Sequence, residues 1–204
     1  MEDLIIRRFE AEDRQQVAAL MASSFRDDWL KIVSLPDDKL PQFLIETGEI
    51  LPYPFEGYMV AEEDGDILGM IKLKWVGQAR PKFNPRTSRI FQYGFVPAVK
   101  LLVMRYFFPE NPEKGACHVS EIAVSEKARR KGIATEMLLF GKKLASGKGL
   151  NKYTLNVDDD NKAAFNLYRK MGFTIEKSRR NLLAKWLLGT DKWHFMSQPI
   201  DGSE

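Results

Sequence analysis

The stretch from His118 to Lys143 constrains the fold of this chain more than any other, because a strand pattern runs there directly into a helix pattern. Its first part, His118 to Val124, alternates and carries β-branched residues, as a strand does. A short polar and basic connection follows, from Ser125 to Lys131. Beyond it, apolar residues recur at helical spacing: Ile133, Met137, Phe140 and Leu144. The stretch therefore predicts a strand, a tight loop and an amphipathic helix in immediate succession.

The loop places three cations, Arg129, Arg130 and Lys131, at the N-terminal end of the predicted helix. The helix dipole is positive at that end, so each cation costs about 0.3–1 kcal/mol unless an anion binds there. Gly132 and Ala134 keep bulky side chains away from the backbone amides. Together these features favour an anion cradle suited to a pyrophosphate. A solvated basic turn before an ordinary helix is the alternative interpretation.

A second stretch, Asp158 to Phe173, predicts a short helix with an acidic, asparagine-containing N-terminus and a glycine stop at Gly172. A strand pattern, Tyr153 to Val157, precedes it. Asn161 and Tyr168 lie seven residues apart, so two helical turns place them on nearly the same face. A half-buried core tyrosine is the alternative role for that phenol.

Together the two stretches resemble the GNAT superfamily of acetyl-CoA-dependent N-acetyltransferases. The first matches the superfamily signature Q/R-x-x-G-x-G/A as RRKGIA, residues 129–134. The second matches N-x-x-A-x-x-L-Y-x-x-x-G-F at Asn161, Ala164, Leu167, Tyr168, Gly172 and Phe173. Both motifs occur in the expected order, each after a strand, and the similarity is dense over residues 118–177.

The resemblance implies a cofactor, acetyl-CoA, and no metal. It also implies that the strand before the cradle splays away from its neighbour, so that pantetheine bonds to the strand backbone. The pyrophosphate would lie on loop and helix amides, and Asn161 would hold the pantetheine arm. The cofactor-binding residues expected on this basis are Ile122, Ala123, Val124, Arg129, Arg130, Lys131, Gly132, Ile133, Ala134, Thr135, Asn161 and Ala164.

The implied reaction brings an amine to a thioester, removes a proton from the ammonium and protonates the leaving thiolate. Tyr168 matches the superfamily's proton donor to the thiolate. The general base that takes the proton from the ammonium is either Glu121 or His118. Strict alternation places these two on opposite faces of the strand, and a bulge would reverse that parity. A salt-bridged surface carboxylate is the alternative role of Glu121.

Asn156 departs from one subtype of the superfamily, which places a glutamate on the strand before the second motif. An amide cannot serve as a base. The departure weakens the similarity to enzymes that acetylate protein N-termini.

Composition narrows the class of protein. The chain has 204 residues and a net charge of +3, so we expect one domain over residues 1–204 and no nucleic-acid partner. The single cysteine, Cys117, fits a reducing cytoplasm, and no metal-ligand spacing occurs around it. Neither a signal peptide nor a membrane span is apparent. We therefore expect a cytoplasmic protein without integral membrane association.

The order of elements predicts an α+β fold, with a mixed central β-sheet flanked by helices. A helix capped by Asp13 and a second helix between Asp37 and Ile50 are expected near the N-terminus. The expected outer strands are Leu4 to Phe9, Tyr58 to Glu62, Ile67 to Trp75, Thr174 to Lys177 and Trp193 to Pro199. The Asp64-Gly65 pair predicts a hairpin turn.

An insert from Gly77 to Gly115 is too long for a simple connection between strands. Its second half, PAVKLLVMRYFF, predicts a helix that is either buried or part of a homodimer contact. Two other interpretations are a lid over the acceptor site and attachment to a membrane surface through Arg105, Phe107 and Phe108.

Three functions remain at this stage. The first is an N-acetyltransferase that acts on a small-molecule or peptide amine by direct attack. The second is a non-catalytic acyl-CoA-binding or sensing module, and the third is a phosphate-backbone binder, against which the mild charge argues.

Overall fold

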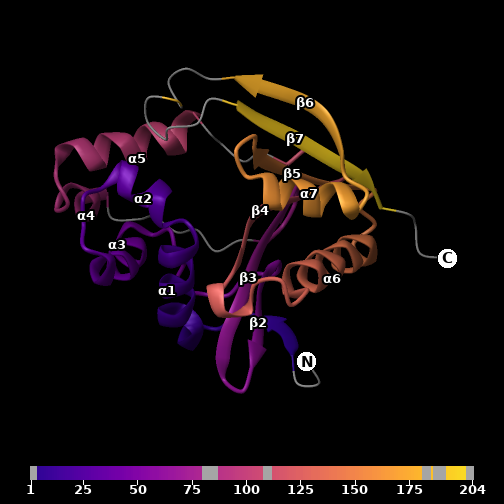
Figure 1. Ribbon diagram of the computed structural model, residues 1–204, viewed down its shortest axis with the longest axis horizontal. Helices are drawn as coiled ribbons and strands as arrows, with labels where there is room; N and C mark the ends of the chain where they lie inside the picture. The colour runs from indigo at the N-terminus through magenta and orange to yellow at the C-terminus, as the bar shows by residue number, and fades with distance from the viewer. Residues whose placement is uncertain (1–3, 80–86, 108–111, 181–184, 186–191, 201–204) are drawn as a thin grey trace.

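The computed structural model describes residues 4–79, 87–107, 112–180, 185 and 192–200. At its centre is a seven-stranded sheet with the strand order β1-β2-β3-β4-β5-β7-β6 (Figure 1). The strands are β1 (Ile5–Arg8), β2 (Tyr58–Glu63), β3 (Asp66–Trp75), β4 (Ala116–Val124), β5 (Lys152–Asp158), β6 (Thr174–Arg180) and β7 (Lys192–Pro199). The α-helices are α1 (Arg14–Ser24), α2 (Arg26–Ile32), α3 (Leu40–Thr47), α4 (Thr87–Phe91), α5 (Phe95–Phe107), α6 (Ile133–Gly147) and α7 (Lys162–Lys170). Short 3₁₀ turns are η1 (Ala11–Asp13), η2 (Asp37–Lys39) and η3 (Glu126–Ala128). The expected α+β fold with a mixed sheet is confirmed.

The strands β4 and β5 form a parallel pair, whereas the other recorded neighbours are antiparallel. Their pairing begins at Ala116 with Lys152 and ends at Val119 with Leu155. β5 nevertheless stays paired with β7 as far as Asp158. The last five residues of β4 therefore diverge from β5, and the expected splay is confirmed.

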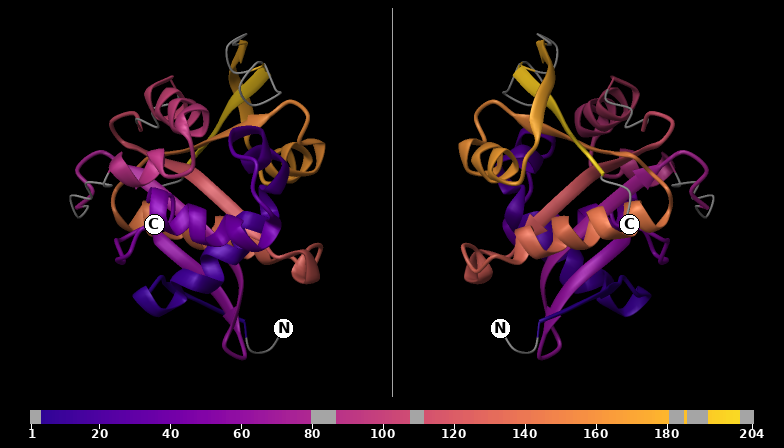
Figure 2. Two further views of the ribbon diagram at one scale, coloured as in Figure 1. Left: turned by 90° about the vertical axis from the view of Figure 1, so that its left-hand side faces the viewer. Right: turned by 90° about the vertical axis from the view of Figure 1, so that its right-hand side faces the viewer.

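Helices cover both faces of the sheet. α1 to α5 gather on one side of β2–β4, and α6 and α7 lie on the other (Figures 1 and 2). The core divides accordingly: one cluster contains Phe9, Phe43, Tyr58 and Met70, and the other contains Leu73, Met137, Tyr153, Leu155 and Phe173. β2 and β3 are covered on both faces, so the residues that point to either side of the sheet are mostly apolar. Their sequences are therefore nearly continuous apolar runs.

The hairpin between β2 and β3 turns at Asp64 and Gly65, whose φ angles are 52° and 82°. Two successive positive φ angles match the right-handed twist of the strands, and the predicted turn is confirmed. Asp13 does precede α1, but its side chain does not cap that helix. Its carboxylate instead binds the guanidinium of Arg7 at 2.7 and 2.8 Å, which ties the helix to β1. The predicted capping contact is therefore wrong. The short helix α2 was not expected.

The insert contains α4 and α5, while residues 80–86 and 108–111 lie outside the described part of the chain. α5 buries Ala98 and Leu101, but Phe95 and Val96 are 73% and 61% exposed. The expectation of a buried helix thus holds for one face only. Tyr93 fastens the insert to α3 by donating a hydrogen bond of 2.7 Å to the carboxylate of Glu46. Of the helices described, none has the length and apolar character needed to span a bilayer.

Candidate active site

The loop between β4 and α6 has the backbone shape of an anion site. Arg130 and Gly132 both adopt left-handed conformations, with φ angles of 64° and 85°. Left-handed residues that alternate with right-handed or extended ones turn successive amides toward one point. A left-handed arginine is uncommon and costs on the order of 1 kcal/mol, so the surroundings impose this shape. α6 begins immediately afterwards, and its first-turn amides add to the same concavity.

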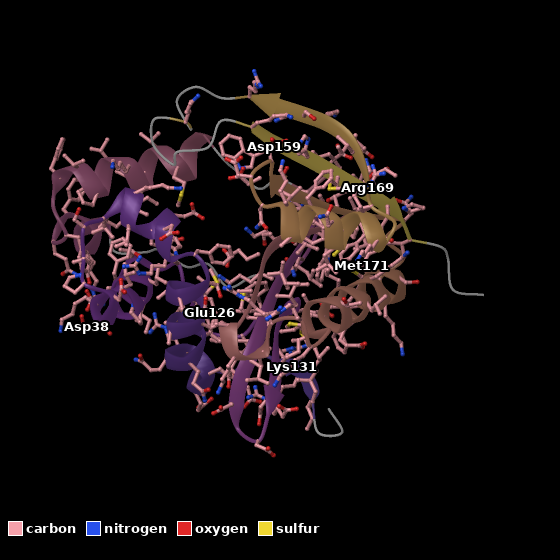
Figure 3. All side chains as sticks on the ribbon, in the orientation of Figure 1. Asp38, Glu126, Lys131, Asp159, Arg169 and Met171 are labelled. Carbon is pink, nitrogen blue, oxygen red and sulfur yellow. The ribbon has the colours of Figure 1, made fainter. Side chains whose placement is uncertain are left out.

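The concavity is open. A Cβ placed on Gly132 would have no atom of the described residues within 4 Å, so none of these residues plugs the bend. In the described part of the chain, the backbone amides of Arg130, Lys131 and Gly132 have no recorded acceptor. The side chains of Arg129 and Lys131 are exposed, and Lys131 lies beside the start of α6 (Figure 3). The site therefore suits a multiply charged anion. A glycine is favoured at position 132 because the backbone has a positive φ angle there, and not because neighbouring atoms leave no room for a side chain.

Packing beneath the loop holds it in place. Ser125 donates its amide to the carbonyl of Leu68 at 2.8 Å, and Ala128 is buried. Gly69 lets α6 lie close to β3, because a Cβ there would come within 2.9 Å of the sulfur of Met137. The helix start is thus fixed against the sheet, which preorganises its amides before any ligand arrives.

A β-bulge at Ser120 decides which side chains of β4 share a face. Lys72 pairs with Glu121 and Leu73 pairs with Val119, which leaves Ser120 as the additional residue. His118 pairs with Lys74, two residues from Lys72 on the same face of β3. Glu121 and His118 therefore face the same side, the side of α1–α3. The strict alternation expected from sequence is wrong here, because a bulge shifts the parity by one residue.

Glu121 forms an ion pair with the buried Lys72, whose Nζ lies 2.7 Å from Oε2. Burial has the largest single effect and lowers the pKa of the Lys72 ammonium, but the Glu121 carboxylate, the Tyr58 phenol and Glu49 together outweigh it, so the pKa is raised. The side chain of Glu121 remains 30% exposed. Glu121 is thus neither a purely surface carboxylate nor a buried one.

His118 is buried and has partners on both ring nitrogens. Nδ1 lies 2.9 Å from Oγ1 of Thr154, and Nε2 lies 3.4 Å from the amide nitrogen of Asn156. These partners indicate a neutral ring with the proton on Nδ1, which leaves Nε2 to accept from Asn156. Burial, and secondarily the charge of Lys74, lowers the pKa of His118 to about 4.

The depressed pKa of His118 predicts acid lability. The imidazole titrates near 6.5 when unfolded and near 4 when folded, so the unfolded state binds the proton first as the pH falls. The free energy of unfolding should drop by up to about 3 kcal/mol on this account between those pH values. Denaturant unfolding at both pH values, compared with His118→Phe, measures the contribution. Phenylalanine retains the stacking on Phe195 and should flatten the dependence; equal slopes would contradict the assignment.

Tyr168 lies on α7 and is only 6% exposed. Its ring packs edge-on against Phe173 at a centroid distance of 5.9 Å. Burial raises the pKa of Tyr168 to about 12, so the phenol is neutral at physiological pH. It can therefore donate a hydrogen bond but not accept a proton readily.

Asn161 caps α7, since its side-chain oxygen accepts a hydrogen bond of 3.1 Å from the amide of Ala164. This capping hydrogen bond is sufficient reason for an asparagine at position 161, whether or not the residue binds a ligand. The capping bond uses only the side-chain oxygen of Asn161, so the side-chain NH₂ group remains available as a donor. The expected contact of Asn161 with a cofactor remains a prediction.

The chain matches the family model described as the acetyltransferase (GNAT) family over residues 18–173. That match spans well over half of the sequence. The chain belongs to the GNAT acetyltransferase family. Acetyl transfer is therefore its general activity, in agreement with the resemblance read from the two motifs.

Solved structures share the fold of this acetyltransferase at low sequence identity. Ard1 from Thermoplasma volcanium is 17% identical with a TM-score of 0.58, covering 96% of this chain and 97% of its own. The PaiA N-acetyltransferase of Thermoplasma acidophilum, solved with coenzyme A, is 17% identical with a TM-score of 0.57, covering 97% and 99%. The ribosomal-protein-S18-alanine N-acetyltransferase of Escherichia coli is 15% identical with a TM-score of 0.57, covering 98% and 96%. No curated protein sequence matches the chain.

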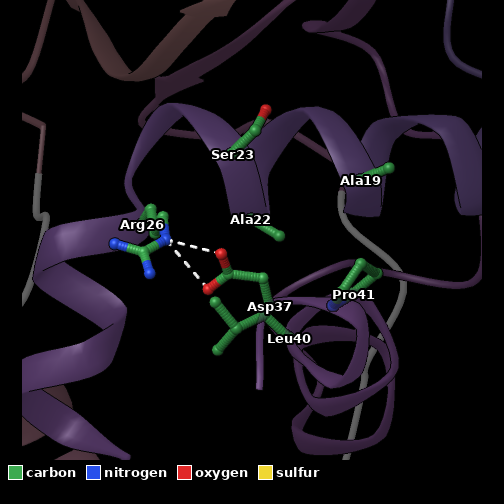
Figure 4. A pocket seen from close by; sticks show the side chains of 7 residues that line it. All are labelled: Ala19, Ala22, Ser23, Arg26, Asp37, Leu40 and Pro41. Atoms are coloured by element: carbon green, nitrogen blue, oxygen red, sulfur yellow. Dashed lines mark hydrogen bonds and ion pairs between the residues drawn. The ribbon is translucent and has the colours of Figure 1, made fainter. Parts of the chain in front are cut away.

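A separate hollow of about 270 Å³ lies between α1 and α3 in this acetyltransferase (Figure 4). Its lining residues are Ala19, Ala22, Ser23, Arg26, Asp37, Leu40 and Pro41. The guanidinium of Arg26 donates to the carboxylate of Asp37 at 2.8 and 2.9 Å, which closes one side. No residue of β4, α6 or α7 lines it, so this hollow is separate from the cradle at the start of α6.

Sequence reasoning missed Lys72, which the structure places against Glu121. A signal was present, because a lysine interrupts the run Met70-Ile71-Lys72-Leu73 in a strand that otherwise reads as buried. A charged residue within such a run needs a partner. Which partner it finds depends on the register of β3 with β4, and that register is not visible in the sequence.

Proposed function

We propose that this acetyltransferase moves the acetyl group of acetyl-CoA to a primary amine by direct attack. The observation that supports this most is the open amide cradle at the end of the strand that diverges from β5. Acetyl-CoA needs the two features together, because its diphosphate would lie on the cradle and its extended pantetheine arm would lie along the diverging strand β4.

The cradle would hold the diphosphate through the amides of residues 130–135, with the side chains of Arg129 and Lys131 adding positive charge at its rim. Beyond Val119 the edge of β4 that faces β5 has no strand partner among the described residues. Backbone groups of Ile122, Ala123 and Val124 on that edge are suited to bond the amides of pantetheine. Asn161 and Ala164 on α7 would line the opposite side.

When bound, acetyl-CoA supplies an activated carbonyl on a good leaving group. The chain contributes position and hydrogen bonds, and positioning alone can account for several kcal/mol of the barrier. Tyr168 would donate its hydroxyl proton toward the sulfur. Because a thiol has a pKa of about 8.5, a phenol near 12 favours a strong hydrogen bond to the developing thiolate over complete proton transfer.

Glu121 is favoured over His118 as the group that takes the proton from the acceptor ammonium, directly or through water. His118 is buried and has both ring nitrogens engaged, so an acceptor amine cannot reach it. Glu121 keeps part of its carboxylate exposed on the α1–α3 side of the sheet. We also propose that residues 1–204 form one such domain, acting in the cytoplasm.

Release of free CoA thiol tests the proposal against three amines: spermidine, tyramine and a peptide with an N-terminal alanine. We expect acetyl-CoA to bind and at least one amine to accelerate thiol release well above the rate without amine. Binding without acceleration by any of the three would instead favour the acyl-CoA-sensing module. No binding by calorimetry would contradict both functions.

A further inference from the structure

We propose that Lys72 is a positioning residue that holds one oxygen of Glu121 and leaves the other oxygen to take the proton from the acceptor amine. The inference rests on the proposed function, in which Glu121 is the base. It concerns a buried ion pair that spans β3 and β4 at the point where β4 leaves β5.

The ammonium of Lys72 is enclosed on three sides. Its Nζ lies 2.7 Å from Oε2 of Glu121 and donates a hydrogen bond of 3.0 Å to the carbonyl of Glu49. It also lies 5.1 Å from the ring centroid of Tyr58, within range of a cation–π contact. The residue as a whole is 5% exposed. The ammonium therefore has little freedom to move, and it fixes whatever it binds.

Packing alone does not require a charge at this position. An unbranched apolar side chain such as methionine would fill the same space, and burying two ions is costly even when they are paired. A buried pair is therefore weak evidence for stability, and we infer that this pair holds its members in one geometry. The group held here is the carboxylate of Glu121.

The two oxygens of that carboxylate differ. Oε2 is shielded from solvent, against Lys72. Oε1 is not among the shielded atoms and has no recorded partner in the described part of the chain, and the side chain is 30% exposed. Oε1 is thus the oxygen that an amine or a bridging water can reach.

A hydrogen bond to the backbone of Lys72 also stabilises the position of Glu121. The bulged residue Ser120 donates a hydrogen bond of 3.2 Å from its hydroxyl to the carbonyl of Lys72. Lys72 therefore anchors both the bulge, through its carbonyl, and the carboxylate that the bulge turns toward α1–α3, through its ammonium. The contact with Glu49 extends this anchor to the loop that follows α3.

The titratable groups that act on Lys72 besides Glu121 are Tyr58 on β2 and Glu49 after α3. The Tyr58 phenol in turn faces Arg14 on α1 and Asp13 on η1. Lys72 is the cation in contact with Glu121, so removing it should free the Glu121 carboxylate to leave this position.

Lys72→Met tests the inference with the panel amine that the wild type acetylates fastest. We expect kcat/KM for the amine to fall at least about tenfold, with an unchanged Kd for acetyl-CoA. Because the Glu121 carboxylate is then no longer held, the loss should fall on the reaction with the amine and not on the binding of acetyl-CoA. Lys72→Arg should restore part of the rate. Lys74→Met, two residues along the same face, is the matched control and should leave kcat/KM unchanged.

A double-mutant cycle covers the case in which Lys72→Met fails to fold, because Lys72→Met with Glu121→Gln leaves no buried unpaired charge. We expect Lys72→Met to cause no further loss of kcat in the Glu121→Gln background. An equal loss in both backgrounds, or an undiminished kcat/KM in Lys72→Met, would overturn the inference while wild-type turnover still supported the proposed function. Absence of thiol release by the wild type with all three amines would contradict the proposed function, and the inference with it.

Discussion

Gly132→Asp is expected to raise the Kd for acetyl-CoA by at least about a hundredfold, which is about 2.7 kcal/mol. The new side chain has room, since no described atom lies within 4 Å of its Cβ, and aspartate is among the residues that tolerate a left-handed conformation, so the fold should survive the backbone strain. Its carboxylate would occupy the cradle that the amides of Arg130 to Thr135 form. Two like charges about 4 Å apart repel by about 4 kcal/mol at an effective dielectric constant near 20, which suffices for the expected loss. Isothermal calorimetry measures it.

Two matched variants separate charge from backbone strain. Gly132→Asn has nearly the same shape as aspartate and tolerates the left-handed conformation equally well, so it should lose far less affinity. Gly149→Asp places the same residue at another open glycine with a positive φ of 69°, beyond the opposite end of α6, and should bind normally. If Gly132→Asp bound acetyl-CoA as the wild type does, the cradle would not be the diphosphate site.

Tyr168→Phe is expected to lower kcat by about a hundredfold while leaving the Kd for acetyl-CoA unchanged. Phenylalanine keeps the ring against Phe173 and removes only the hydroxyl, which we assign to the leaving sulfur. Because the substitution removes a donor and no packing, the loss should appear in turnover rather than in binding or melting temperature. Steady-state thiol release and calorimetry measure the two quantities separately.

Tyr153→Phe provides the control for this substitution. Tyr153 is a buried tyrosine of β5 in the same cluster, and its hydroxyl has no hydrogen-bond partner among the described residues. Removing that hydroxyl should leave turnover intact and cost no stability. Undiminished turnover in Tyr168→Phe would exclude the sulfur-donor role and leave Tyr168 as a core residue.

The loop and the helix ends that form the proposed cofactor site could be predicted from sequence because their determinants are local. The left-handed bend at Gly132, the start of α6 beside it and the cap of α7 by Asn161 each depend on residues within a few positions of one another. Short-range steric and hydrogen-bonding preferences decide such features. The order of strands and helices followed from periodicity for the same reason.

The acceptor side depended on pairing between distant segments, and there the sequence was insufficient. The bulge at Ser120 shifts the register of β4 against β3 by one residue, which moves Glu121 to the face of His118. Nothing in the local pattern marks that shift. The exposed apolar face of α5 was likewise not predictable, since what a helix buries depends on the elements that reach it.

By itself, therefore, the sequence determined the family, the order of elements and the loop that suits a diphosphate, because these arise from contacts between near neighbours along the chain. Only the tertiary structure decided at which residue β4 leaves β5, that Glu121 faces α1–α3 and that Lys72 pairs with it. Sheet register and burial bring those groups together over tens of residues. The charges and hydrogen bonds of these groups interact strongly only where the fold excludes water around them.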